Sequence, residues 1–275
     1  MKLNKASPIG VFDSGVGGLS ILKALQAQMP HEQFVYVADS SHAPYGERDA
    51  SFVQQRAAHL LQTLREQHQV KALVVACNTA TALAIQNMRS AFPELPMFGV
   101  EPAIKPAAAM SHTKRVGVMA TPATLQSDKF QTLLSSLLTE AEFVLQACEG
   151  LADAIEQQWQ HTDNQGVAAL CKKYVEALGA FGTQAGQMDV LVLGCTHYPF
   201  ATNELRALVG PQVHIVETGA PVARHTHSVL EDRGLLSDAG AGGVVLLATG
   251  DTHNLQHAAN MWLQSTTALN VQQLV

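Results

Sequence analysis

The stretch LVVACNT, residues 73–79, returns later in the chain as LVLGCTH, residues 191–197. In both copies an apolar run with the composition of a buried strand ends in a cysteine, and polar residues follow it at once. Strands that are apolar on both faces and alternate with helices are typical of parallel sheets covered on both sides. The pair therefore predicts an α/β fold in which each cysteine lies at the carboxyl end of a strand.

Three further pairs of segments repeat in the same order. IGVFDS (9–14) matches VGVMAT (116–121), QFVYVAD (33–39) matches EFVLQAC (142–148), and GVEPAIKPA (99–107) more loosely matches IVETGAPVA (215–223). Self-similarity that keeps its order and nearly keeps its spacing indicates two copies of one structural unit. We therefore predict two pseudo-symmetric domains, each a mostly parallel sheet flanked by helices, with the active site in the cleft between them.

Short runs rich in β-branched residues mark the expected strands, and the clearest amphipathic helix is expected at residues 50–68. The strands are expected at residues 9–12, 34–38, 72–76, 97–100, 116–119, 143–146, 190–194, 213–216 and 244–248. The last of these strands and a helix from about residue 254 to 264 have no counterpart in the repeat.

The composition is that of an ordinary folded protein, with 47% hydrophobic and 15% charged residues in a chain of 275. A net charge of −6 and the absence of a Lys/Arg cluster give no indication of a nucleic-acid partner. No stretch reaches the roughly 18 apolar residues of a membrane span. The N-terminus lacks the apolar region of a signal peptide, so we expect a cytoplasmic protein with no membrane partner.

Cys77 and Cys195 occupy equivalent places in the repeat. In open α/β sheets, ligands bind beyond the carboxyl ends of the strands, so the two thiols are expected to approach each other across a pseudo-twofold axis. Asn78, Thr79 and Thr196 follow them and are typical of helix N-termini, where unpaired N–H groups favour thiolate over thiol. Both positions therefore suit a reactive cysteine.

Two facing thiols allow three kinds of chemistry. They could form a redox disulfide, hold a metal together with His197, or act as acid and base on opposite faces of one substrate. The sequence lacks the close spacing of a redox pair and has no zinc-type ligand run near either cysteine. Moving a proton from one face of a stereocentre to the other requires two similar groups in mirror positions, so the acid/base interpretation accounts directly for the symmetry.

Six motifs carry a resemblance to a known family: FDSGVGGLS (12–20), PYGER (44–48), ACNTATA (76–82), GVEPA (99–103), GVMATPATLQS (117–127) and LGCTHYP (193–199). Together they resemble glutamate racemase, the bacterial enzyme that supplies D-glutamate for cell-wall peptidoglycan. The resemblance implies interconversion of L- and D-glutamate by 1,1-proton transfer, without cofactor or metal. It also implies a discontinuous first domain, residues 1–100 with 218–275, and a second domain of residues 101–217. Members of the family often form homodimers, so a homodimer is an assembly that the resemblance implies.

The resemblance also implies roles for individual residues. Cys77 would act on D-glutamate and Cys195 on L-glutamate, with Asp13 beside the first thiol and His197 beside the second. A further acidic helper corresponds to Glu156, with Glu149 as its competitor. Substrate contacts are expected from Asp13, Ser14, Tyr45, Gly46, Asn78, Thr79, Thr121, Thr124, Thr196 and His197.

Two other functions stay open at the level of the sequence. A racemase of the same superfamily that acts on aspartate or another acidic amino acid would share the motifs, and comparing the turnover of glutamate and aspartate would separate the two. A glutamate-binding regulatory protein could keep the fold without turnover. The presence of Asp13, Cys77, Cys195 and His197 together argues against that reading, since a protein without catalysis need not keep all four.

Overall fold

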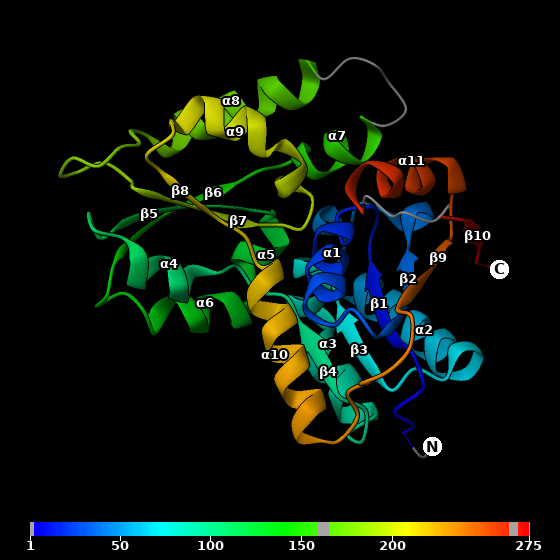
Figure 1. The fold of residues 1–275 in the computed structure, drawn as a ribbon. Coiled ribbons are helices and arrows are strands. Elements are labelled where there is room, and N and C mark those ends of the chain that lie inside the picture. The colour runs from blue at the N-terminus through cyan, green and yellow to red at the C-terminus, as the bar shows by residue number, and fades with distance from the viewer. Residues whose placement is uncertain (1–2, 159–164, 264–268, 275) are drawn as a thin grey trace. The chain divides into compact units, whose positions relative to one another are not determined.

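The computed structural model describes residues 3–158, 165–263 and 269–274. The chain divides into two compact units, one formed by Met1–Val100 with Gly219–Val275 and the other by Glu101–Thr218. Both are drawn in Figure 1, and each is described here by itself. That the two units are domains with the boundaries expected from the sequence stays a prediction.

In the first unit the described strands form a six-stranded sheet in the order β10-β9-β2-β1-β3-β4. Its strands are β1 (Ile9–Asp13), β2 (Gln33–Ala38), β3 (Ala72–Val75), β4 (Met97–Gly99), β9 (Gly243–Ala248) and β10 (Val271–Gln273). Every pairing in this sheet is parallel. The carboxyl ends of the strands therefore meet at one edge, where β1 ends at Asp13 and β3 leads into Cys77.

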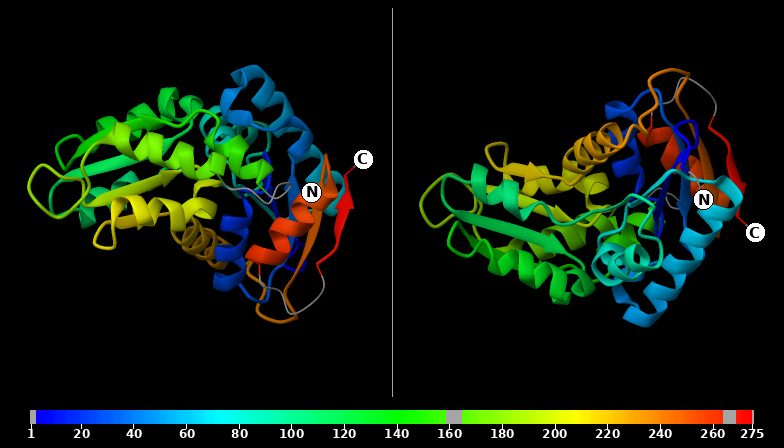
Figure 2. Two further views of the ribbon diagram at one scale, coloured as in Figure 1. Left: turned by 90° about the horizontal axis from the view of Figure 1, so that it is seen from above. Right: turned by 90° about the horizontal axis from the view of Figure 1, so that it is seen from below.

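Helices cover both faces of this sheet (Figure 2). On one face lie α2 (Ala50–His68) and α3 (Asn78–Ala91), which pack on each other, and on the other lie α1 (Leu19–Gln28), α10 (Gly219–Asp232) and α11 (Thr252–Trp262). Helix α2 buries Val53, Ala57, Leu60, Leu61 and Leu64, the one-sided spacing of an amphipathic helix. Two short 3-10 helices, η1 (Ser40–His42) and η2 (Tyr45–Glu47), lie between β2 and α2.

The second unit has four described strands in the order β6-β5-β7-β8, again with every pairing parallel. They are β5 (Arg115–Ala120), β6 (Glu142–Ala147), β7 (Val190–Gly194) and β8 (His214–Val216). Its helices are α4 (Ile104–Met110), α5 (Pro122–Gln126), α6 (Asp128–Ser135), α7 (Leu151–Gln157), α8 (Gln165–Leu178), η3 (Tyr198–Ala201) and α9 (Thr202–Val209). Two separate apolar clusters, one containing Leu191 and Leu193 and the other Val190 and Val192, show that the sheet is buried on both faces.

The expected fold class is confirmed, since both units are parallel sheets flanked by helices. The repeat is also visible in the topology, because β2-β1-β3-β4 and β6-β5-β7-β8 place the matched segments in the same order. The position of the active site in a cleft between the units stays a prediction. Among the described helices, none is both long and apolar enough to cross a membrane.

Each expected strand is present, with ends that shift by at most one residue, and helix α2 has its expected bounds. The expected helix at about 254–264 is α11, Thr252–Trp262, and residue 264 lies outside the described residues. Strand β10 was not expected. Its sequence VQQ lacks an apolar run, and it forms the outer edge of the sheet by pairing with β9 alone among the described strands.

Candidate active site

The residues expected at the site fall into two groups, one in each unit. In the first unit they follow β1, β2 and β3, and in the second they follow β5 and β7 or lie on α7. These are the carboxyl ends of parallel strands, where α/β sheets bind ligands.

Cys77 follows β3 and is the N-cap residue of α3. Its Sγ atom accepts a hydrogen bond from the Ala80 N–H at 3.5 Å, and it lies 3.9 Å from the Ser14 hydroxyl. The sulfur therefore takes the place that a serine or aspartate oxygen usually takes at a helix start. This confirms the expected position at a helix N-terminus, where the partial positive charge favours an anion.

Asp13 ends β1 and is fully buried. Its Oδ2 atom accepts the Gly18 N–H at 2.6 Å, and the Tyr36 hydroxyl donates to the Gly15 carbonyl at 2.6 Å. A Cβ atom on Gly18 would lie 2.7 Å from the Asp13 Cβ and 2.8 Å from the Tyr36 hydroxyl oxygen. Only glycine lets the chain pass so close, so this residue keeps the loop closed around the Asp13 carboxylate.

Asn78 and Thr79 open helix α3 and are buried. The Asn78 side-chain amide donates to the Val100 carbonyl at 3.3 Å. Its Oδ1 atom is buried and has no hydrogen-bond partner within the described part of the chain. A buried acceptor left in this state is unusual in a folded protein, and a bound N–H group would satisfy it.

Tyr45 is buried, and its hydroxyl donates to the Asp39 carboxylate at 2.5 Å. The hydroxyl proton is therefore engaged within the protein, and the expected substrate contact of Tyr45 stays a prediction. Burial and the neighbouring Asp39 charge raise the pKa of Tyr45 far above its ordinary value. Gly46 follows in the same 3-10 helix and has no side chain, so a substrate contact from this residue would use its main chain.

In the second unit three side chains form a chain of contacts. The Cys195 Sγ atom lies 3.8 Å from His197 Nδ1, and His197 Nε2 lies 2.7 Å from Glu156 Oε2. All three residues are buried, with Cys195 and His197 directly after β7 and Glu156 on α7. Glu149 is exposed, so the geometry selects Glu156 as the acidic partner of the histidine.

The ionisation of His197 follows from these neighbours. Burial by itself lowers the pKa of the imidazole, but the contacts with Cys195 and Glu156 outweigh it and raise the pKa well above its ordinary value. With both ring nitrogens protonated, His197 donates to the carboxylate on one side and faces the sulfur on the other. The geometry therefore places a protonated imidazole between the Cys195 sulfur and the Glu156 carboxyl group.

Thr196 differs from its expected role. It lies in a turn rather than at the start of an α-helix, because the Tyr198 N–H bonds back to the Cys195 carbonyl and the 3-10 helix η3 begins at Tyr198. Cys195 therefore lacks the helix start that holds Cys77. Thr121 does cap a helix, since its hydroxyl oxygen accepts the Thr124 N–H at 3.3 Å at the start of α5.

The two remaining cysteines, Cys148 and Cys171, are buried in the apolar cluster on one face of the second sheet. Burial raises the pKa of Cys171 to about 12 and that of Cys148 further still. They are therefore neutral thiols at physiological pH. Within the described ranges, no three His, Cys, Asp or Glu side chains are grouped so that they could hold a metal ion.

The Asp/Glu/hydantoin racemase family model matches residues 19–226, which is more than half of the chain. The chain belongs to this family. The resemblance drawn from the sequence motifs is thereby confirmed at the level of the racemase family.

Individual relatives are similar over nearly the full length. The glutamate racemase of Pseudomonas entomophila is 42% identical to the chain over 262 residues, which cover 95% of this chain and 96% of that protein. Two solved racemases share the fold. The first, a glutamate racemase isoform of Bacillus anthracis, has a TM-score of 0.84 at 31% identity, with 99% of this chain and 98% of that chain covered. The Escherichia coli glutamate racemase, solved with L-glutamate and the activator UDP-MurNAc-ala, has a TM-score of 0.83 at 27% identity and 98% coverage of both chains.

Proposed function

We propose that this protein is a cofactor-independent glutamate racemase that interconverts L- and D-glutamate with two cysteines as acid and base. The observation that carries the proposal is the equivalent position of Cys77 and Cys195 after matched strands of two like units. Relatives of nearly full-length similarity bear the name glutamate racemase, which supports the choice of substrate.

In the direction from L- to D-glutamate, the Cys195 thiolate removes the α-proton, and the electron pair of the C–H bond passes to the α-carbon and its carboxylate. The Cys77 thiol then delivers its proton to the opposite face, which leaves Cys77 as thiolate and Cys195 as thiol. The return direction reverses each step. This mechanism requires both sulfur atoms to reach one α-carbon from opposite sides.

The neighbouring groups have distinct tasks in this proposal. His197, held by Glu156, stabilises the Cys195 thiolate by facing it with a protonated nitrogen. Ser14, whose hydroxyl lies 3.9 Å from the first thiol, and Asp13, which ends the neighbouring strand β1, assist the proton transfer of that thiol. N–H and hydroxyl donors aimed at the α-carboxylate would stabilise the charge that builds up there, which is often the largest catalytic contribution.

Substrate binding is assigned to polar groups at the same strand ends. The unpartnered Asn78 Oδ1 atom suits the substrate ammonium group, since it can only accept. The hydroxyls of Thr79, Thr121, Thr124 and Thr196, and the main chain of Tyr45 and Gly46, suit its carboxylates. In this proposal the protein works in the cytoplasm, where its product serves peptidoglycan synthesis, and its units act as domains of residues 1–100 with 218–275 and 101–217.

Proton NMR in D2O tests the proposal, with purified protein, no added cofactor, and L-glutamate, D-glutamate or L-aspartate as separate substrates. We expect the α-proton signal of both glutamate isomers to disappear as each converts to the other. Faster conversion of aspartate would replace glutamate by aspartate as the substrate. Binding of glutamate without exchange would refute the racemase and support the regulatory protein. Sedimentation of the same sample would test the homodimer.

A further inference from the structure

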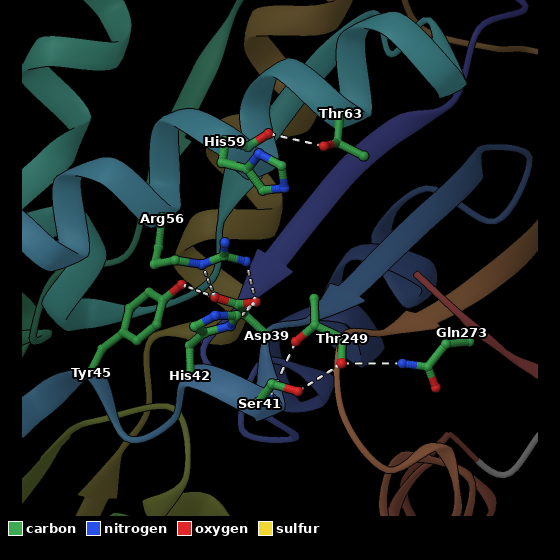
Figure 3. A network of polar contacts seen from close by, with 9 residues as sticks. All are labelled: Asp39, Ser41, His42, Tyr45, Arg56, His59, Thr63, Thr249 and Gln273. Carbon is green, nitrogen blue, oxygen red and sulfur yellow. Dashed lines mark hydrogen bonds and ion pairs between the residues drawn. The ribbon is translucent and has the colours of Figure 1, made fainter. Parts of the chain in front are cut away.

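Asp39 follows β2 directly, and its carboxylate is fully buried among four donors (Figure 3). Arg56 donates through Nε to Oδ2 at 3.0 Å and through Nη2 to Oδ1 at 2.8 Å. The Tyr45 hydroxyl donates to Oδ2 at 2.5 Å, and His42 Nδ1 lies 3.0 Å from Oδ1. A carboxylate only accepts, so this His42 nitrogen carries a proton.

This carboxylate stays ionised despite its burial. Burial acts to raise the pKa of Asp39, but hydrogen bonds from Arg56 and Tyr45 and the charge of Arg56 lower it below its ordinary value. The paired arginine contact is the strong, two-bond kind that fixes direction as well as distance. Asp39 therefore fixes the positions of the Arg56, Tyr45 and His42 side chains.

The side chains that contact the Asp39 carboxylate come from the connection between β2 and α2 and from α2 itself. Arg56 belongs to α2, whereas His42 and Tyr45 lie in η1 and η2, so these contacts fasten residues 40–49 to the end of β2. The Ser41 hydroxyl donates to the Thr249 carbonyl at 2.7 Å, which ties the same segment to the end of β9. Figure 3 shows these contacts converging on Asp39 and Thr249.

Asp39 also contacts the first half of the candidate site directly. Its own N–H donates to the Asp13 carbonyl at 2.9 Å. Tyr45, which it holds, belongs to the same buried cluster as Cys77. One carboxylate thus braces the backbone beside Asp13 and the segment that carries Tyr45 and Gly46.

We propose that Asp39, together with Arg56, is a positioning residue that holds the main chain of Tyr45 and Gly46 in the place where it meets the substrate. Asp39 makes no contact with the substrate itself, because it is buried and its oxygens are occupied by protein donors. The inference rests on the proposed function and adds Asp39 and Arg56 to the residues expected at the site.

The structure supplies a matched control at the other end of the same strand. Glu32 precedes β2 and is buried; it accepts from Lys71 Nζ at 2.7 Å and from the Ser237 N–H at 2.7 Å. Glu32→Gln and Asp39→Asn thus each remove the charge of a buried, cation-paired carboxylate. Only Asp39 lies at the edge of the sheet that carries the candidate site.

The experiment compares Asp39→Asn, Arg56→Lys and Glu32→Gln with the unaltered protein by KM and kcat for both glutamate isomers and by thermal unfolding. We expect Asp39→Asn to raise KM about tenfold, the equivalent of about 1.4 kcal/mol, with a smaller change in kcat. Arg56→Lys keeps the charge but loses the paired geometry, so its KM should lie in between. Glu32→Gln should lower the unfolding temperature yet leave KM unchanged.

Two results would overturn the inference: an unchanged KM in Asp39→Asn, or an equal rise of KM in Glu32→Gln, which would mean that general loosening is responsible. If Asp39→Asn does not fold, Arg56→Lys and Arg56→Gln decide in its place, because Tyr45 and His42 still satisfy the Asp39 carboxylate. An unaltered protein without racemase activity would refute the proposed function and this inference together. The two results on KM refute only the inference, so the two kinds of failure can be told apart.

Discussion

Replacement of Glu156 by glutamine tests the second half of the candidate site most sharply. The 2.7 Å contact between Glu156 Oε2 and His197 Nε2 is buried, and it favours the protonated imidazole that faces Cys195. A hydrogen bond to a charged group contributes about 1.5–3 kcal/mol. Loss of that contribution to the protonated imidazole beside Cys195 corresponds to a fall in kcat/KM of about 10- to 150-fold.

The sign of the accompanying pH effect follows from the same contact. Glu156 raises the pKa of His197 against the opposing effect of burial. Without its charge the imidazole loses its proton at lower pH, so the alkaline limb of the activity profile should move to lower pH. Because the two enantiomers have equal free energies in water, kcat/KM must fall by the same factor in both directions, which provides an internal check.

The assay measures initial rates in both directions by circular dichroism across the pH range. Glu149→Gln is the matched control, because this carboxylate lies just before the same helix but is exposed. Its rates should match those of the unaltered protein. An effect of Glu149→Gln larger than that of Glu156→Gln would refute the assignment of the acidic partner, as would a Glu156→Gln variant with an unshifted profile.

Three further experiments have defined outcomes. Cys77→Ser and Cys195→Ser should each reduce the rate of racemisation by about a thousandfold, the scale of general acid–base catalysis. NMR in D2O should still detect α-proton exchange of the one isomer that the remaining thiol serves. Exchange of both isomers in either variant would contradict the two-base scheme. Gly18→Ala places a methyl group 2.7 and 2.8 Å from buried atoms and should lower the free energy of unfolding by about 1–3 kcal/mol in urea. Gly166→Ala should not, because no atom beyond its chain neighbours and its own helix backbone lies within 4 Å of the added carbon. The pKa of Asp39 is lowered in the folded protein, so this carboxylate contributes stability above its unfolded pKa, and that stability is lost as the pH falls through the folded pKa. Asp39→Asn should therefore make the unfolding temperature fall less steeply with decreasing pH. An unchanged pH dependence would contradict this reasoning.

The strands and the places of the two thiols could be predicted because local pattern decides them. Apolar runs such as LVVA and LVLG cannot be exposed, and a cysteine directly after such a run must lie at a strand end. Strand β10 escaped prediction because its polar residues join the sheet through backbone pairing with β9, which leaves no trace in hydrophobic pattern.

Contacts between distant residues limited the prediction of the site. Asp39 and Arg56 are 17 positions apart and lie in different elements, so no spacing rule joins them. The engaged hydroxyl of Tyr45 could not be foreseen for the same reason. The expectation for Thr196 was wrong because a residue of the capping type caps a helix only when the helix starts directly after it, and Thr196 is followed by a turn.

The two thiols are held by different means, which has a consequence for chemical modification. Cys77 accepts from the Ala80 N–H and lies near the Ser14 hydroxyl, whereas Cys195 faces the imidazole of His197. A small electrophile should therefore alkylate Cys195 at a rate that follows the protonation of that imidazole, while its rate with Cys77 does not. The pH chosen for labelling would then select which of the two cysteines carries the adduct. The proposed reaction yields a racemic mixture, so its product does not reveal this difference between the two thiols.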